Sequence, residues 1–244
     1  MAKTNFIIFN PEGGLGKIIA STAVVRNIKK NYPDHKIVVS TPWPEVYLNN
    51  PHVWRVFRTG NNPYFYKDYI KDRETLVFKG EPYFNTGEVQ RTQRTFLRDK
   101  PLLLLQTNGG MYKDNPRDYC WTRDIPHNQA EFLARELTKT FAVLHITRPN
   151  SPKFQNIESL NEIDKRTLML LTAVAAKRIL IDSCLQHAAA ALDAPSTVLW
   201  VGTHPEVFGY DIHNNIKPVA EPVKDQNTAY IDSLFFDYDF NGPE

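Results

Sequence analysis

One stretch limits the possible folds more than any other: "ILIDSCLQHAAAALDAPSTVLWVG", residues 179–202. An apolar segment runs directly into Asp182 and Ser183, an alanine-rich segment follows, and a second apolar segment begins after Pro195. This order predicts a strand, a helix and a second strand. Two strands joined through a helix are parallel, so the stretch predicts an α/β protein with a parallel sheet.

The same pattern appears twice more along the chain. Residues 6–9 read as a buried strand, residues 18–30 as a helix, and residues 37–40 as a second strand. The pattern restarts after Pro101, where a strand, a helix and a strand are expected at 102–105, 129–138 and 141–146. We therefore predict two Rossmann-like domains, an N-terminal one over residues 1–100 and a C-terminal one over residues 101–244.

Residues 51–100 are harder to order. The segments "VWRVF" and "TLVFK" have the composition of strands, whereas "EVQRTQRTFLRDK" has that of a basic helix. Arg91, Arg94 and Arg98 share one face of this helix, which favours a solvated surface over a site for a polyanion.

Composition excludes several classes of protein. The 244 residues are 42% hydrophobic, which is enough for a substantial core, and a net charge of +2 neither implies nor excludes nucleic acid. The only two cysteines form no CxxC pair, which argues against a disulfide framework or a cysteine zinc site. The apolar N-terminal run is too short for a signal peptide, and no run has membrane-spanning length. We expect a cytoplasmic protein without a transmembrane segment.

The helix that follows Asp182 has a well-marked start. With Ser183 as the N-cap, Gln186 falls at the third helical position, which is a capping-box pattern. Backbone N–H groups at a helix start on the carboxyl edge of a parallel sheet favour phosphate. His187 lies in the first turn, where the helix dipole favours a neutral imidazole that donates one hydrogen bond. A merely capped helix is the alternative interpretation.

The same part of the sequence resembles a known family. The segment "ILIDSCLQHAAAALDAPSTVLWVGTHPEVFG" is similar to the donor-binding segment of the heptosyltransferase-type glycosyltransferases, family 9. The positions in register are Asp182, Ser183, His187, Ala188, Ala190, Pro195, Gly202 and Pro205, while Cys184 stands where the family has glycine. The first strand, glycine loop and helix, and the segments "LLLLQTNGG" and "CWTRDIPHNQAEFLARELTK", are similar as well. The chain is shorter than the family norm, mostly in its N-terminal half. The identity of the acceptor is therefore the property that the resemblance implies least.

The resemblance implies a GT-B-like fold and a metal-independent glycosyltransferase without a cofactor. Such an enzyme moves a sugar with inversion from a nucleotide-diphosphate donor, here ADP-heptose, to an acceptor that is a glycan, a lipopolysaccharide core or nucleic acid. The implied donor-binding residues are Asp182, Ser183, Gln186 and His187, with Lys113 or Arg117 from the long loop before His127. A nucleotide or nucleotide-sugar binding protein without activity is the alternative.

The glycine loop "NPEGGLGKIIAS" contains Gly13, Gly14 and Gly16. It matches neither a Walker A loop nor a dinucleotide loop, and its glycines favour either a ligand close to the backbone or a tight turn. The resembled family has an acid soon after the last glycine, where this chain has Lys17. Glu12 is therefore the candidate base, and Lys17 is expected to contact an anion.

Two further sets of acids remain as weaker candidates. The alternative bases to Glu12 are Asp114, Asp118 and Asp124. Asp237 and Asp239 form a D-x-D pattern of the kind that binds a metal in other glycosyltransferases. The pair lies beyond the last predicted strand, so we expect a solvated end and no metal site.

Overall fold

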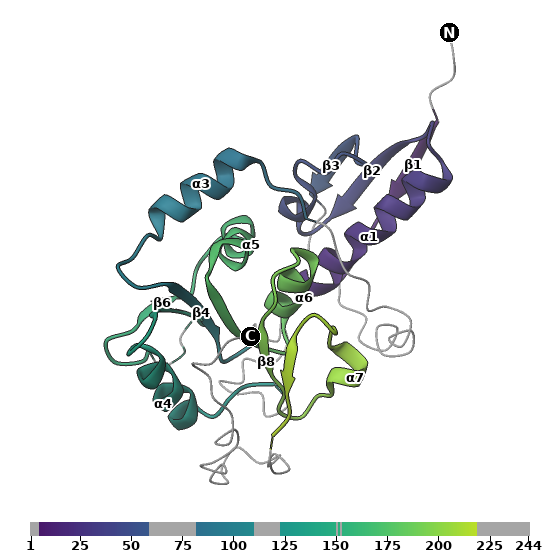
Figure 1. Ribbon diagram of the computed structural model, residues 1–244. Helices are drawn as coiled ribbons and strands as arrows, with labels where there is room; N and C mark the ends of the chain where they lie inside the picture. The colour runs from purple at the N-terminus through teal and green to yellow at the C-terminus, as the bar shows by residue number, and fades with distance from the viewer. Residues whose placement is uncertain (1–4, 59–81, 110–122, 150, 152, 219–244) are drawn as a thin grey trace.

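The structure is a computed structural model that describes residues 5–58, 82–109, 123–149, 151 and 153–218. It is an α/β protein with two parallel sheets, as predicted (Figure 1). The first sheet has the order β1-β2-β3, and its strands are β1 (Phe6–Phe9), β2 (Lys36–Thr41) and β3 (Arg55–Arg58). The second has the order β6-β5-β4-β7-β8-β9.

The second sheet contains every strand after residue 100 that the structure describes. Its strands are β4 (Leu102–Gln106), β5 (Ala142–Ile146), β6 (Glu158–Leu160), β7 (Lys177–Ile181), β8 (Thr197–Leu199) and β9 (Asn214–Ile216). The helices are α1 (Leu15–Asn31), the 3-10 helix η1 (Pro44–Tyr47), α3 (Thr86–Thr95), α4 (His127–Leu137), α5 (Lys165–Val174), α6 (Cys184–Ala191) and α7 (Pro205–Phe208).

The six-stranded sheet is covered on both faces, as a parallel sheet requires. Side chains alternate along each strand, so Leu104 and Leu180 pack with α5 and α6, while Leu103 and Ile179 pack with α4. The alanines of α6 are all buried and let this helix lie close to the sheet.

The three-stranded sheet is different. Helix α1 covers one face, where Ile37 and Val39 are fully buried. On the opposite face Phe6 is 49% exposed and Ile8 is 74% exposed. The prediction of a strand at residues 6–9 is confirmed, but the prediction that it is buried is wrong, because among the described residues only one face of this sheet is covered.

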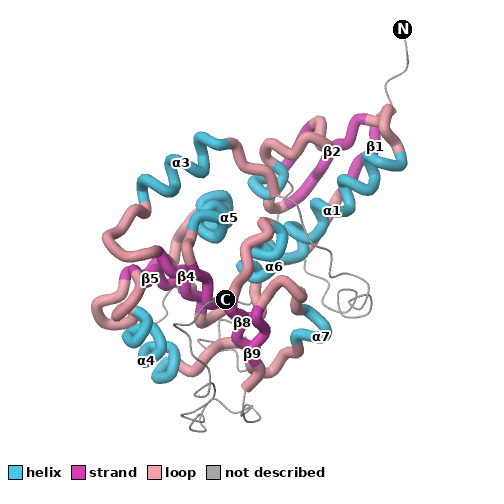
Figure 2. The backbone as a smooth tube through the Cα atoms, viewed as in Figure 1, coloured by secondary structure: helices cyan, strands magenta, loops and turns pink. Residues whose placement is uncertain are grey.

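The two sheets share one hydrophobic core. A single cluster contains Ile18 and Ile19 of α1, Tyr47 of η1 and Leu185 of α6. Figures 1 and 2 show α1 running from the first sheet to the start of α6, so that this helix packs against both halves. The division of the chain at residue 100 stays a prediction.

A buried arginine joins the second half to the segment between the sheets. Arg166 of α5 donates to both carboxylate oxygens of Glu88, at 3.0 and 2.9 Å, and to the carbonyls of Tyr83 and Glu45. The same Glu88 forms a capping box with Asn85 at the start of α3. The hydrogen bond from Arg166 lowers the pKa of Glu88, which keeps the carboxylate charged.

Several elements and one signal in the sequence were not predicted. The edge strands β6 and β9 have only three residues each, which is too short for a periodic pattern. Asn85 and Glu88 stand at capping-box spacing, so the start of α3 was readable from the sequence. The predicted strand "TLVFK" lies outside the described residues. In the part of the chain that is described, no helix is both long and apolar enough to cross a membrane.

The buried His145 makes stability depend on pH. Its Nε2 lies 2.8 Å from the hydroxyl of Thr107, its ring stacks on Phe154, and burial lowers its pKa to about 4. The unfolded chain binds this proton at about pH 6.5, so the folded state is favoured most above that pH. The contribution is lost as the pH falls from about 6.5 to about 4, and it totals about 3 kcal/mol.

We therefore expect His145→Gln to flatten this pH dependence, because glutamine cannot take up the proton. Urea unfolding of both proteins at about pH 7 and about pH 5 measures the change in stability. The exposed His204 provides the control, since His204→Gln should leave the wild-type dependence intact. An equal loss of stability on acidification in His145→Gln and wild type contradicts the assignment.

Candidate functional site

The first turns of α1 and α6 lie against each other where the two halves meet. A Cβ atom added to Gly16 would lie 2.7 Å from Cδ2 of His187 and 3.4 Å from Cα of Cys184. Any side chain at residue 16 would therefore collide with the imidazole. A glycine here was expected to serve a ligand or a tight turn, and the structure gives a third reason, which is helix packing.

The other glycines of the loop have different roles. Gly13 has a φ of 115°, a conformation that favours glycine strongly. Gly14 is the N-cap of α1, and nothing lies within 4 Å of an added Cβ. The carbonyl of Gly13 accepts a hydrogen bond from Nε1 of Trp43 at 3.3 Å, which fixes the loop to the segment after β2.

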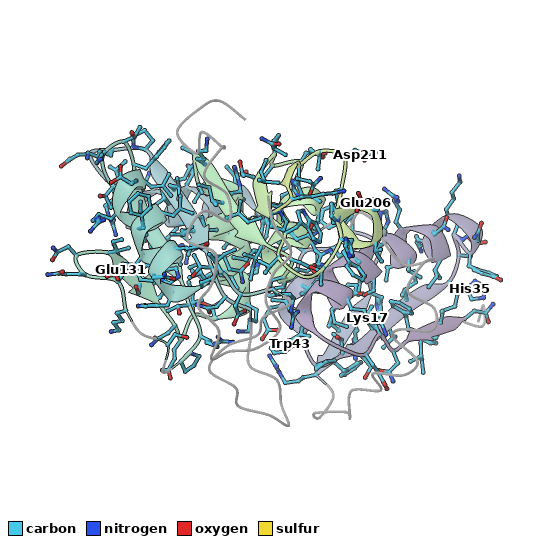
Figure 3. All side chains as sticks on the ribbon, turned by 90° about the horizontal axis from the view of Figure 1, so that it is seen from below. Lys17, His35, Trp43, Glu131, Glu206 and Asp211 are labelled. Atoms are coloured by element: carbon cyan, nitrogen blue, oxygen red, sulfur yellow. The ribbon has the colours of Figure 1, made fainter. Side chains whose placement is uncertain are left out.

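Glu12 and Lys17 flank this loop. Glu12 is half-buried and accepts a hydrogen bond from Asn10 at 3.4 Å, and Lys17 lies in the first turn of α1. Figure 3 places Lys17 and Trp43 where the first half of the molecule meets the second. Glu12 and Lys17 thus lie on the same segment as Gly16, which contacts the first turn of α6.

The start of α6 differs from the prediction in one respect. Ser183 is the N-cap, but its side chain makes no capping hydrogen bond. Gln186 is completely buried, and its amide donates to the carbonyl of Phe208 at 3.0 Å and to Asp182 at 3.4 Å. The predicted capping box is therefore wrong, because these two acceptors hold the amide. Gln186 supports the helix start from inside, with buried Asp182 as its neighbour.

His187 is half-buried at the end of the first turn. Its Nδ1 lies 2.8 Å from the hydroxyl of Tyr210, and the two rings meet edge to face. Tyr210 was not identified from the sequence, since no motif or helical spacing links it to His187. Burial raises the pKa of the neighbouring Cys184 thiol, which keeps it protonated.

No family model matches the sequence, and no curated protein matches it. Solved structures do match. The E. coli ADP-heptose lipopolysaccharide heptosyltransferase II superposes with a TM-score of 0.65 at 14% identity, over 88% of this chain and 91% of that chain. The fold is the GT-B fold of the heptosyltransferases.

Two further structures agree. A family 9 glycosyltransferase from Veillonella parvula has a TM-score of 0.58 at 13% identity, over 87% of this chain and 85% of its own. The E. coli heptosyltransferase WaaC with ADP has a TM-score of 0.56 at 11% identity, over 86% and 92%. WaaC has also been solved with ADP-2-deoxy-2-fluoro heptose. The resemblance seen in the sequence is thus confirmed at the level of the fold.

In this GT-B fold one alternative base can be rejected. Asp124 is 1% exposed, pairs with Arg148 at 2.6 Å and accepts a hydrogen bond from the backbone N–H of Gly109. A buried carboxylate held in an ion pair is a poor base. The pair instead ties the end of β4 to the end of β5. Lys113, Arg117, Asp114, Asp118, Asp237 and Asp239 lie outside the described residues.

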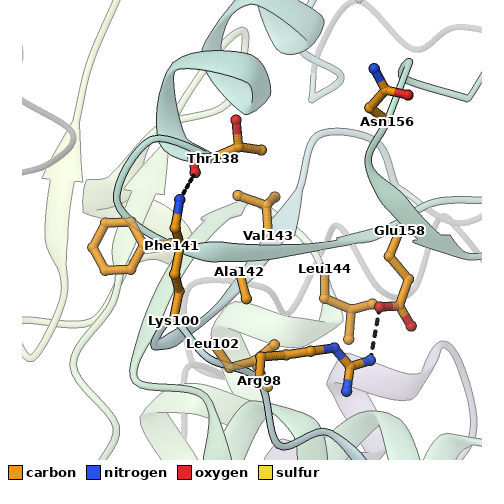
Figure 4. A pocket seen from close by; sticks show the side chains of 10 residues that line it. All are labelled: Arg98, Lys100, Leu102, Thr138, Phe141, Ala142, Val143, Leu144, Asn156 and Glu158. Carbon is orange, nitrogen blue, oxygen red and sulfur yellow. Dashed lines mark hydrogen bonds and ion pairs between the residues drawn. The ribbon is translucent and has the colours of Figure 1, made fainter.

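A pocket of about 260 Å³ lies at the opposite edge of the second sheet, at the amino ends of β4 and β5 (Figure 4). The two cationic side chains that line the pocket have partners within the protein. Arg98 pairs with Glu158 at 2.8 Å, and Lys100 donates a hydrogen bond to the carbonyl of Thr138 at 2.7 Å. Arg91 and Arg94 are exposed on α3, as expected for a solvated face. Among the described residues, no three histidine, cysteine or acidic side chains gather as metal ligands.

Gly16→Ala tests the packing of α1 on α6. Helix propensity alone favours alanine by about 1 kcal/mol, whereas a Cβ at 2.7 Å from His187 should cost about 1–3 kcal/mol. We expect net destabilisation in denaturant unfolding and partial relief when His187→Ala is added. Gly14→Ala is the matched control and should change stability by less than about 1 kcal/mol, since its Cβ meets nothing. A more stable Gly16→Ala protein contradicts the predicted close contact.

Proposed function

We propose that this protein is a metal-independent, inverting glycosyltransferase that uses a nucleotide-diphosphate sugar. The observation that carries the proposal is the contact of the glycine loop with the first turn of α6 at Gly16 and His187, in a GT-B fold. It joins the glycine loop, which carries the candidate base, to the turn that carries the candidate donor-binding residues. ADP-heptose is the donor that the resemblance favours, and it belongs to the class bound in the WaaC structures.

The donor diphosphate would bind at the start of α6. The first-turn N–H groups and the positive end of the helix dipole attract its negative charge. The Ser183 hydroxyl, which does not cap the helix, would contact a phosphate oxygen. His187 would donate a hydrogen bond to a phosphate oxygen, while Asp182 and Gln186 hold the turn from inside.

The transfer itself would be a direct displacement. Glu12 takes the proton of the acceptor hydroxyl as the oxygen attacks the anomeric carbon of the sugar. The bond from that carbon to the diphosphate oxygen breaks, and its electron pair leaves with the diphosphate. Attack from the opposite face inverts the anomeric centre. The helix N–H groups and Lys17 stabilise the charge that develops on the leaving group.

The presence of Lys17 favours a second candidate function, which is that of a nucleotide-sugar binding protein without transferase activity. A cation at the place of the family acid is a poor general base at neutral pH. Measurements of donor affinity and of turnover distinguish the glycosyltransferase from the binding protein.

Ser183→Ala and His187→Ala should each weaken ADP binding about ten- to a hundred-fold, because each removes a hydrogen bond to a charged group worth about 1.5–3 kcal/mol. Titration calorimetry with ADP and with ADP-heptose measures the loss. His35→Gln is the control, since His35 is also half-buried but lies at the far end of the first half (Figure 3). Unchanged affinity in both variants removes α6 from the donor site.

Glu12→Gln decides whether the protein is an enzyme of the proposed kind. It should lower kcat about 10²- to 10⁴-fold with ADP affinity nearly unchanged, whereas Lys17→Ala should raise KM. Mass spectrometry of the product from ADP-heptose and candidate glycan acceptors follows turnover. Glu131→Gln on α4 is the control, because Glu131 is also half-buried and lies far from the glycine loop (Figure 3). Activity gained in Lys17→Asp from an inactive wild type supports the binding protein instead.

A further inference from the structure

The segment from Phe208, the last residue of α7, to His213 is joined by hydrogen bonds to the first turn of α6. Gln186 donates to the carbonyl of Phe208 at 3.0 Å, and Nε2 of His213 donates to the carbonyl of Gln186 at 2.9 Å. Tyr210, between these two contacts, places its hydroxyl 2.8 Å from Nδ1 of His187. Three contacts from one short segment therefore fix the turn that carries His187.

The position of Tyr210 is itself fixed. An added Cβ at Gly209 would lie 2.6 Å from the carbonyl oxygen of Pro205, so only glycine fits where the chain turns back from α7. The amide of Asn215 donates to the carbonyl of Tyr210 at 3.1 Å and accepts from the indole of buried Trp200 at 2.9 Å. These contacts hold the tyrosine beside α6 without help from a ligand.

The imidazole of His187 is held on two sides. The Tyr210 hydroxyl occupies the Nδ1 side, and the backbone of Gly16 lies against the side formed by Cδ2 and Nε2. The ring edge that carries Nε2 therefore faces the glycine loop. In the neutral imidazole one ring nitrogen carries the proton and the other accepts a hydrogen bond.

We propose that Tyr210 is a positioning residue that selects the tautomer of His187. Its O–H donates to Nδ1, which places the imidazole proton on Nε2, on the edge beside the glycine loop. This inference rests on the proposed function for its purpose: phosphate oxygens only accept hydrogen bonds, so the nitrogen that meets the donor diphosphate has to carry a proton. The opposite tautomer would turn a lone pair toward the negative charge.

The direct test is the tautomer of His187 in the unliganded protein, read from ¹⁵N chemical shifts at a pH where the ring is neutral. We expect the proton on Nε2 in wild type. His187→Gln assigns the signals. His213 is an internal reference, because its Nε2 donates to a carbonyl and must carry the proton in every variant. A wild-type His187 with its proton on Nδ1 overturns the proposal.

Tyr210→Phe removes only the hydroxyl and keeps the ring that packs between His187 and His213. We expect His187 to become a mixture of both tautomers while His213 stays unchanged, and ADP affinity to fall about 3- to 10-fold. In a His187→Gln background the same change should not alter ADP affinity further. An unchanged tautomer in Tyr210→Phe overturns the positioning role.

The two proposals fail separately. If wild type binds neither ADP nor ADP-heptose, the proposed function is wrong, and the tautomer measurement still decides whether Tyr210 sets the protonation of His187. If wild type binds ADP but the tautomer does not depend on Tyr210, the proposed function stands and this inference is wrong.

Discussion

The close packing of α1 on α6 is the constraint on which the rest of the structure depends. Two helices from different sheets meet at their first turns, which is possible only because residue 16 has no side chain. The alanines of α6 play the same part on the other side, where the helix lies on the second sheet. Gly16 on one side of α6 and the alanines on the other thus allow the first turns of α1 and α6 to lie side by side. Each of these turns follows the carboxyl end of a strand.

Most of the fold was predictable because its signals are local. Long apolar strands such as β4 and β7 and the helix after Ser183 are marked by periodicity and by their flanking polar residues. The edge strands β6 and β9 depend on pairing with a neighbour, which a single sequence does not display. The exposure of Ile8 was missed for a related reason, since a strand pattern does not say how many faces a sheet has covered.

The site was predictable only in part. Ser183 and His187 became candidates through a motif, and the glycine loop through its composition. The partners of these residues were not, because the contact of His187 with Tyr210 joins a helix to a turn that is defined by tertiary structure alone. The capping box failed where a distant carbonyl, that of Phe208, offered Gln186 a better buried partner than the helix start. Local rules gave way where buried polar groups had to be satisfied.

The buried pair of Arg166 and Glu88 has a consequence for how the molecule can move. Pulling α5 away from α3 and η1 would break this ion pair and the hydrogen bond from Arg166 to the carbonyl of Glu45. Helices α1 and α6, by contrast, meet through apolar side chains and the bare backbone of Gly16. The junction between the halves thus combines an apolar contact at α1 and α6 with a charged contact at Arg166, and separating α5 from α3 breaks an ion pair as well as apolar contacts.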